Sequence, residues 1–383
     1  MRYHQVCLES CGYTLPQEVI TSDQLERQLE PLYQRLRLPE GRLELMSGIQ
    51  ERRFWSPEML PSDMSIASGE RAIAAGGIDR NQIGALIHGS VCRDFLEPAT
   101  ACRVHYHLGL PAHCVIYDVS NACLGLMNGL LQAANMIELG QIRAALVLGT
   151  ESGRNLVETT IADLNRDQTL TRRQLKLSIA SLTIGSGSCA ILLTDRELSR
   201  SGNRLVAASA RAHTAHHQLC QSERDDAVGA GMQPRMATDS EVLMEQGIAT
   251  GVATFADFLS ETGWTVAEID RVFCHQVGVA HRKQMLNALA IPEGRDFVTY
   301  PWLGNTGAVA LPITLALGAE QGQVQPGDKT ALLGIGSGIN CLMLGIHWQR
   351  SLVDGGTEQR PTAGSEALIP NGSDRDARTS SGV

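Results

Sequence analysis

Several features are scarce in this chain of 383 residues, and each absence excludes a class of protein. Aromatic residues make up only 4%, so a mainly aliphatic core in an α/β protein is expected. Positive charge is in deficit, and the net charge of −9 argues against nucleic acid or an anionic membrane as the main partner. No window approaches the ~18 uninterrupted apolar residues of a membrane span, because Asn128, Gln132 and Asn135 interrupt the best candidate.

Paired metal-binding or redox cysteine motifs are also absent. The ten cysteines include no Cys-x-x-Cys pair, and no signal peptide precedes them, so a soluble cytoplasmic protein with reduced thiols is expected. His213, His216, His217 and Cys220 lie within eight residues and could ligate a metal. A surface loop is the favoured interpretation, because nothing else in the chain requires a metal.

The stretch from residue 114 to residue 152 organises the rest of the chain. Residues 114–119 are a short apolar run typical of a buried strand, and small residues lead to Cys123. A helix is expected over Leu124–Leu139, and the next buried strand over Ala144–Leu148. Small residues along the helix, among them Gly125 and Gly129, indicate that another element packs very close to it.

Cys123 stands at the predicted start of this helix. Unpaired N–H groups and the positive end of the helix dipole stabilise a thiolate there, which predicts a nucleophile with a lowered pKa. Free cysteines are also common as small buried residues, so this stretch alone leaves both interpretations open.

The second half of the chain repeats the first. Asn121 stands 28 residues before Gly149, and Asn305 stands 29 residues before Gly334, with small residues, an apolar helix, a Gly-Gln pair and a strand in both intervals. This duplication predicts two halves, residues 1–195 and 196–349, each with a mainly parallel sheet, stacked with shared helices between them.

Other segments predict the remaining organisation. A helix is expected from Ser22 toward Leu36, with a polar connector over residues 38–48. Apolar periodicity stops at Arg350, and residues 350–383 are expected to form a disordered tail.

The duplication brings polar residues together. His275 ends the repeat's copy of the strand that ends at Gly89, and Asn305 occupies the position that corresponds to the region of Cys123. Ligands bind such sheets at the carboxyl ends of their strands, so Cys123, His275 and Asn305 are expected to meet. A plain helix N-cap remains the alternative for Asn305.

Residues 334–338 form a glycine-rich segment between two predicted strands. Residues 340–348 read as a strand, whereas a phosphate-binding glycine loop would need a helix there. Two interpretations remain: a tight hairpin, or backbone N–H groups directed at an oxyanion.

Four motifs together resemble the thiolase superfamily in its β-ketoacyl synthase III branch. They are residues 121–125 (NACLG), 274–276 (CHQ), 304–307 (GNTG) and 336–338 (GSG), and residues 48–53 are also similar. The resemblance covers roughly residues 3–349. It implies a five-layer αβαβα fold, a homodimer and a triad of Cys123, His275 and Asn305. The backbone N–H groups of Cys123 and Ser337 would hold the oxyanion.

Within that branch, residues 90–98 (SVCRDFLEP) and 332–341 resemble the OleA-type enzymes of olefin biosynthesis. Those enzymes join two fatty acyl-CoA molecules without decarboxylation, using a glutamate that enters the partner subunit's site and that Glu97 matches. An acid before Pro98 could alternatively favour a helix start. The tryptophan that stacks on the CoA adenine in many synthase III enzymes is absent from Arg42–Ser47.

The resulting prediction is an acyltransferase that catalyses a Claisen condensation through an acylated Cys123, with acyl-CoA thioesters as substrates and no further cofactor. An acyl carrier protein and downstream olefin or lipid enzymes are candidate partners. The main alternative is a decarboxylative β-ketoacyl synthase III that uses malonyl-ACP. A catalytically silent subunit and a thiol hydrolase are less favoured, because the Cys, His and Asn set is intact and the surroundings of Cys123 are not papain-like.

Overall fold

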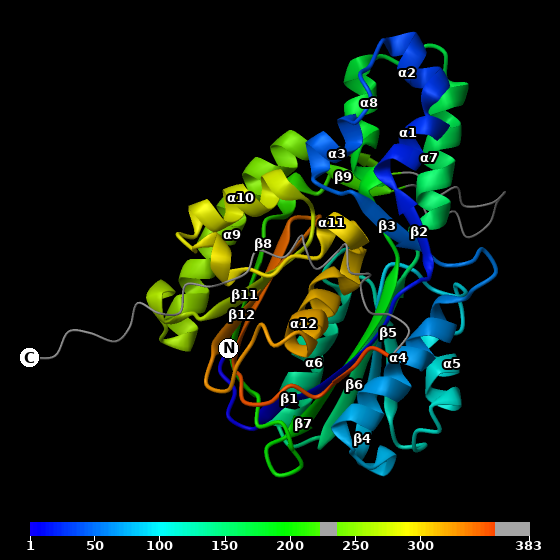
Figure 1. The fold of residues 1–383 in the computed structure, drawn as a ribbon. Helices are drawn as coiled ribbons and strands as arrows, with labels where there is room; N and C mark the ends of the chain where they lie inside the picture. The colour runs from blue at the N-terminus through cyan, green and yellow to red at the C-terminus, as the bar shows by residue number, and fades with distance from the viewer. Residues whose placement is uncertain (223–235, 357–383) are drawn as a thin grey trace, which may run out of the picture.

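The computed structural model describes residues 1–222 and 236–356. Its central strands form one continuous hydrogen-bonded sheet that folds into two stacked parts, the first and the second sheet. Figure 1 shows five layers, in which helices α6 and α12 lie between the sheets while α4 and α5 cover one outer face and α9 and α10 the other. This is the predicted αβαβα arrangement. Within the described residues, no helix is both long enough and apolar enough to cross a bilayer.

The first sheet has the strand order β5-β4-β6-β7-β1. The neighbours of β4 are parallel to it, whereas β7 is antiparallel to both β6 and β1. The strands are β1 (Val6–Thr14), β4 (Ile83–Gly89), β5 (Val115–Val119), β6 (Ala144–Glu151) and β7 (Gly187–Asp195).

The second sheet repeats this order as β11-β12-β13-β8, and a bridge between Val272 and Asp296 stands where β5 stands in the first sheet. A pairing of Cys7 with Arg204 joins β1 to β8, so hydrogen bonds connect both sheets. The strands are β8 (Arg204–Ala212), β11 (Arg271–Cys274), β12 (Lys329–Gly336) and β13 (Asn340–His347).

The expectation of mainly parallel sheets is wrong, because each sheet is mixed. A parallel neighbour requires a crossover connection that returns the chain to the starting edge. After β6 the chain instead builds α7 (Arg154–Arg166) and α8 (Arg172–Ser178) beyond the sheet edge, and β7 therefore runs back antiparallel. In the second half a tight turn joins β12 directly to β13, with the same result.

The two central helices are α6 (Gly125–Glu138) and α12 (Ala310–Glu320). Residues 310–319 of α12 are all buried, as expected for a helix that is apolar on every side. A Cβ atom on Gly129 would lie 2.6 Å from Val147 Cγ1. The glycines of α6 therefore allow the close packing against β4 and β6 that the sequence predicts.

Helices cover both outer faces, and a further group forms a cap at the top of Figure 1. The covering helices are α4 (Pro61–Gly76), α5 (Thr100–His107), α9 (Ser240–Thr262) and α10 (Val279–Ala288). The cap contains α1 (Ser22–Gln28), α2 (Glu30–Leu36), α3 (Arg42–Ser47), α7 and α8, beside the two-stranded antiparallel sheet of β2 (Glu18–Thr21) and β3 (Glu51–Phe54).

Two expectations for the cap are wrong in detail. The helix predicted from Ser22 to Leu36 is interrupted at Leu29, because Pro31 fits only the first turn of a new helix. Thr21 supplies the N-cap and forms a capping box with Gln24. The predicted connector contains the short helix α3.

The chain beyond Arg350 begins as part of the fold rather than as a tail. β14 (Val353–Asp354) pairs in parallel with β1, and Cys11 N donates to Leu352 O at 2.9 Å. Sequence periodicity misses so short a strand. The rest of the predicted tail, residues 357–383, lies outside the described residues.

Candidate active site

Cys123 lies in the sharp turn that connects β5 to α6. Ala122 has a φ of 44°, and Leu124 is the N-cap of α6, which begins at Gly125. A Cβ on Gly125 would lie 3.0 Å from Gly89 C, so the turn packs directly on the carboxyl end of β4. The predicted position of the cysteine just before the central helix is thus correct.

The predicted lowering of the Cys123 pKa is wrong in direction. Burial, together with the nearby Glu151 and Cys220, raises the pKa of this thiol to about 12. Desolvation disfavours the charged thiolate more strongly than the helix start favours it. The thiol is therefore neutral before substrate binds, and a base must take its proton during attack.

His275 directly follows β11 and is buried, with 5% of its surface exposed. Its backbone N–H donates to Leu333 O of β12 at 3.1 Å. Among the described residues, its Nδ1 atom has no hydrogen-bond partner. Burial and the nearby His281 lower the pKa of His275 to about 3, so the imidazole is neutral and can either accept a proton or donate an N–H.

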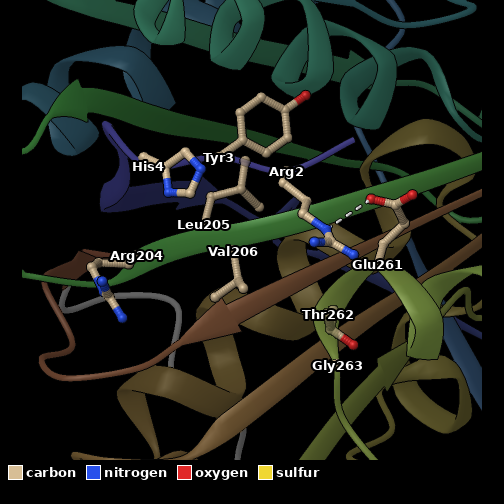
Figure 2. Close-up of a pocket in the computed structure, with 9 residues that line it drawn as sticks. All are labelled: Arg2, Tyr3, His4, Arg204, Leu205, Val206, Glu261, Thr262 and Gly263. Atoms are coloured by element: carbon tan, nitrogen blue, oxygen red, sulfur yellow. Dashed lines mark ion pairs between the residues drawn. The ribbon is translucent and has the colours of Figure 1, made fainter.

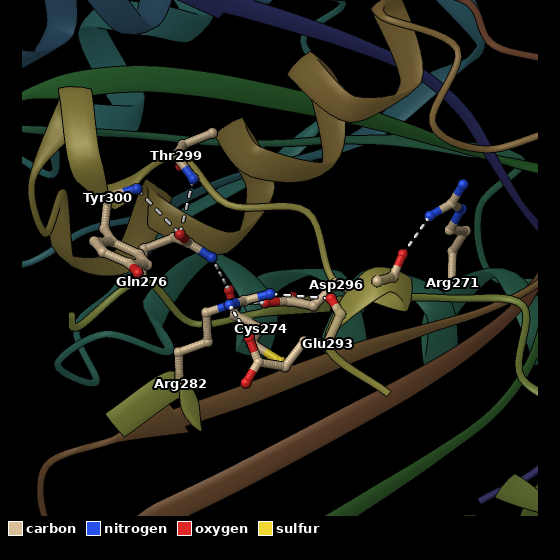
Figure 3. Close-up of polar contacts among 9 residues, drawn as sticks. Arg271, Cys274, Gln276, Arg282, Glu293, Asp296, Thr299 and Tyr300 are labelled. Atoms are coloured by element: carbon tan, nitrogen blue, oxygen red, sulfur yellow. Dashed lines mark hydrogen bonds and ion pairs between the residues drawn. The ribbon is translucent and has the colours of Figure 1, made fainter. Parts of the chain in front are cut away.

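The backbone around His275 is tied to the segment that leads to Asn305 (Figure 3). Gln276 Nε2 donates to Cys274 O at 2.8 Å, while Gln276 Oε1 accepts from Thr299 N at 2.9 Å and Tyr300 N at 3.1 Å. One amide side chain therefore connects the end of β11 with the start of α11 (Tyr300–Leu303).

Asn305 is not the N-cap of the helix that follows. A short 3-10 turn, η6 (Gly307–Val309), intervenes, and Val309 precedes α12. The Asn305 side-chain Oδ1 accepts from Gly307 N at 3.0 Å. Because this hydrogen bond fixes the position of Oδ1, it also fixes the direction in which the Nδ2 group of Asn305 can donate a hydrogen bond.

The glycine-rich segment after β12 forms a tight turn into β13, as one of the two interpretations predicted. A Cβ on Gly336 would lie 3.5 Å from Cys123 N, so this turn abuts the cysteine. Asn340 Nδ2 donates to Ser337 O at 3.1 Å and to Asn121 Oδ1 at 3.3 Å. The two segments that carry the predicted oxyanion donors, Cys123 and Ser337, are thereby held together.

Sequence reasoning missed Glu151, a buried acid at the end of β6. Its Oε1 accepts from Val91 N at 2.9 Å and from Ala308 N at 3.3 Å. Glu151 also acts electrostatically on Cys123, so it is near the cysteine as well as the turn after Asn305. The sequence did contain a signal for this residue, because Glu151 is a charged residue at the end of an otherwise uncharged, mainly apolar strand.

Glu97 stands apart from these residues in the single chain. It lies on the exposed loop between β4 and α5, where the side chains of Phe95 and Leu96 are 56% and 54% exposed. The structure therefore ties the end of β11 to the segment before Asn305 through Gln276 and sets the turn after β12 against Cys123, but it leaves Glu97 on the surface.

Two cavities differ in their relation to these residues. A small one of about 10 Å³ is lined by His275, His281 and mainly apolar side chains. A larger one of about 310 Å³ lies at the chain start, where Arg2 forms an ion pair of 3.4 Å with Glu261 (Figure 2). Its lining contains none of the predicted site residues, and its charged groups do not suit an acyl chain.

The histidines of residues 213–217 lie on a loop at the surface. His213 and His217 are exposed, and the rings of His213 and His216 meet edge to face at 4.4 Å. Within residues 1–222 and 236–356, no group of three or more His, Cys, Asp or Glu side chains is arranged to hold a metal.

Two family models match the chain on either side of its centre. Residues 52–191 match the thiolase N-terminal domain, and residues 259–348 match the C-terminal domain of 3-oxoacyl-[acyl-carrier-protein] synthase III. Duplicated mixed sheets around two central helices, with a cysteine before the first helix, define a thiolase-type condensing enzyme.

Comparison with individual proteins narrows this class. An acyl-CoA:acyl-CoA alkyltransferase of Shewanella oneidensis is 44% identical over 351 residues, which cover 91% of this chain and 100% of that protein. A crystal structure of a substituted form of Xanthomonas campestris OleA is 32% identical, with a TM-score of 0.85, and covers 91% of this chain and 98% of its own. A β-ketoacyl-[acyl-carrier-protein] synthase III of Laribacter hongkongensis is 27% identical over 86% of this chain and 94% of its own. The chain belongs to the family of acyl-CoA:acyl-CoA alkyltransferases, the OleA enzymes.

Acid should destabilise the protein partly through His275. Its pKa of about 3 when folded lies below the usual value near 6.5, so this contribution to stability is complete above pH 6.5 and is lost as the pH falls toward 3. Between pH 7.5 and pH 5 the wild type should lose about 2 kcal/mol more than His275→Asn does. Chemical denaturation of both proteins at the two pH values measures this difference, and equal losses would contradict a neutral buried imidazole.

Proposed function

We propose that this enzyme joins two fatty acyl-CoA molecules by a non-decarboxylative Claisen condensation that yields a β-ketoacid. Membership of the acyl-CoA:acyl-CoA alkyltransferase family is the observation that carries this proposal, and a glutamate at position 97 supports it. The ten cysteines are free thiols, which favours a cytoplasmic location.

In the first half-reaction, Cys123 attacks the carbonyl carbon of one acyl-CoA. Neutral His275 accepts the thiol proton and passes it to the departing CoA sulfur, so that free CoA and a Cys123 thioester result. The backbone N–H groups of Cys123 and Ser337 hold the oxyanion of the tetrahedral intermediate. Because burial raises the pKa of Cys123, little thiolate forms beforehand, and the proton has to leave as the thiol attacks.

In the second half-reaction, the second acyl-CoA becomes the nucleophile. Glu97 removes a proton from the carbon next to its carbonyl group, while His275 and Asn305 donate hydrogen bonds to the enolate oxygen. The carbanion attacks the Cys123 thioester, forms the new carbon–carbon bond and expels the Cys123 thiolate. Return of the proton that Glu97 removed restores the thiol and the carboxylate. Hydrolysis of the resulting β-ketoacyl-CoA then gives the β-ketoacid and CoA.

We also propose that two copies of the chain form the working enzyme, with Glu97 acting in the partner's site. In the single chain the loop around Glu97 exposes three apolar side chains: Val91, Phe95 and Leu96. Strand β5 lies at the sheet edge, and Val115 on it is 48% exposed. Exposed apolar side chains beside an unpaired strand edge favour burial against a second subunit.

A single incubation separates this function from the decarboxylative alternative. Purified enzyme supplied with acyl-CoA alone should form β-ketoacid, detected by mass spectrometry together with the release of CoA. A β-ketoacyl synthase III would remain inactive until a malonyl thioester is added. Condensation that depends strictly on the malonyl substrate would therefore favour the alternative.

His275→Ala and Asn305→Ala should separate the two half-reactions. Both side chains donate to an enolate oxygen that exists only during condensation, and losing one such donor costs roughly 10²–10³ in rate. Condensation should fall by that factor in each variant, whereas Asn305→Ala should still acylate Cys123 at close to the wild-type rate. His275→Ala should acylate more slowly because it also lacks the base, but the Cys123 thioester should accumulate with time. Mass spectrometry of the intact protein follows acylation, and a failure of Asn305→Ala to acylate would contradict the assignment.

A further inference from the structure

Glu151 is a buried acid whose oxygens gather backbone N–H groups from two separate loops. Only 6% of its surface is exposed. Oε1 accepts from Val91 N at 2.9 Å and from Ala308 N at 3.3 Å, and Oε2 accepts from Cys92 N at 3.3 Å. All three partners are donors, which suits the ionised carboxylate because it only accepts. Burial raises the pKa of Glu151, and the hydrogen bonds from Val91 and Ala308 counteract part of that rise.

One of these loops orients Asn305. Gly307 and Ala308 follow it closely in the chain, and Gly307 N donates to Asn305 Oδ1. Glu151 packs so closely here that a Cβ on Gly307 would lie 3.1 Å from its Cγ atom. The Glu151 carboxylate thus holds the turn at Gly307 and Ala308, and this turn orients the side-chain amide of Asn305.

The other loop leads to Glu97. Val91 and Cys92 open the exposed segment on which Glu97 stands, and Ser152 N donates to Cys92 Sγ at 3.3 Å. Glu151 and Ser152 therefore anchor the start of that segment to the end of β6. The Glu151 side chain therefore contacts both the turn that orients Asn305 and the start of the loop that carries Glu97.

We infer that Glu151 is a positioning residue of the condensation reaction, which joins the Asn305 turn to the base of the Glu97 loop and places a negative charge beside Cys123. The expected effect on condensation rests on the proposed function. The charge has a consequence that is independent of the substrate, because it disfavours a thiolate at Cys123.

Glu151→Gln keeps the size of the side chain but replaces one acceptor oxygen by an NH₂ group that faces backbone donors. The kcat for condensation should fall by about 10- to 10²-fold with little change in KM, because misplaced catalytic groups slow chemistry more than binding. Alkylation of Cys123 by iodoacetamide should instead become faster at pH 8–9, because removal of the charge lowers the thiol pKa. Glu151→Asp, which retains the charge, should keep the alkylation profile close to that of the wild type.

Glu9→Gln is the matched control. Glu9 is fully buried and also accepts backbone N–H groups, from Arg200 at 2.8 Å and Ser201 at 3.2 Å, but these partners belong to none of the site segments. This variant should lose stability without changing the pH profile of Cys123 alkylation, which peptide mass spectrometry measures specifically.

The inference is overturned if Glu151→Gln condenses at the wild-type rate. It is also overturned if Glu151→Asp, which retains the charge, is alkylated as fast as Glu151→Gln, since loosened packing rather than charge would then explain the faster reaction. Failure of the proposed function is distinguishable, because the wild type itself would then form no β-ketoacid from acyl-CoA alone while the alkylation comparison would still apply.

Discussion

Cys123→Ser should form no thioester when mixed with acyl-CoA, and its condensing activity should be lost completely. Serine keeps the size and the helix-start position but is a much weaker nucleophile than a thiol whose proton His275 can take. Intact-protein mass spectrometry should show one acyl group per wild-type chain and none on the variant. Peptide mapping should place that acyl group on Cys123.

Cys102→Ser provides the comparison for this experiment. Cys102 is also a free, partly buried thiol, but it lies on the outer helix α5. Its replacement should leave both the adduct and the activity unchanged. An adduct that persists in Cys123→Ser on any other cysteine would show that the nucleophile has been wrongly assigned.

Glu97→Gln should still acylate Cys123 but should make almost no β-ketoacid from two acyl-CoA molecules. Proton removal next to a thioester requires a base near that carbon, and an amide cannot serve. A malonyl thioester should restore some condensation, because loss of carbon dioxide then generates the carbanion. If Glu97→Gln condensed two acyl-CoA molecules at the wild-type rate, the decarboxylative mechanism would be favoured instead.

Mixing two inactive variants tests whether Glu97 acts across a dimer. In a mixed dimer of Cys123→Ser and Glu97→Gln chains, the intact Cys123 of one chain faces the intact Glu97 of the other. Co-expression should therefore restore activity at one site of each mixed dimer. No restoration, with mixed dimers demonstrated by differently tagged chains, would place Glu97 in its own chain's site or outside catalysis.

Local patterns in the sequence were sufficient for most of the architecture. Apolar runs and capping residues placed the strands and helices, and the repeated interval from Asn121 to Gly149 revealed the duplication. The same repeat predicted that His275 and Asn305 lie at strand and helix ends facing the region of Cys123. Apolar runs, capping residues and internal repeats can be recognised in the sequence because they depend only on the order and spacing of residues along the chain.

The strand directions required the tertiary structure. A connection shows in the sequence only as residues of a certain composition, whereas its path decides whether the next strand runs parallel or antiparallel. The excursion through α7 and α8 could not be distinguished from a crossover on the sheet face. The two-residue strand β14 was equally hidden, because its pairing partner β1 lies more than 300 residues away in the chain.

The chemistry of the site divides in the same way. The sequence by itself determined the family that the chain resembles, and it predicted the reacting side chains Cys123, His275, Asn305 and Glu97. Only the tertiary structure decided that burial raises the pKa of Cys123 and lowers that of His275, and that Glu151 supports two loops at once. Burial and charge proximity arise from segments distant in sequence, so the protonation state of a residue follows from the packed fold rather than from its own motif.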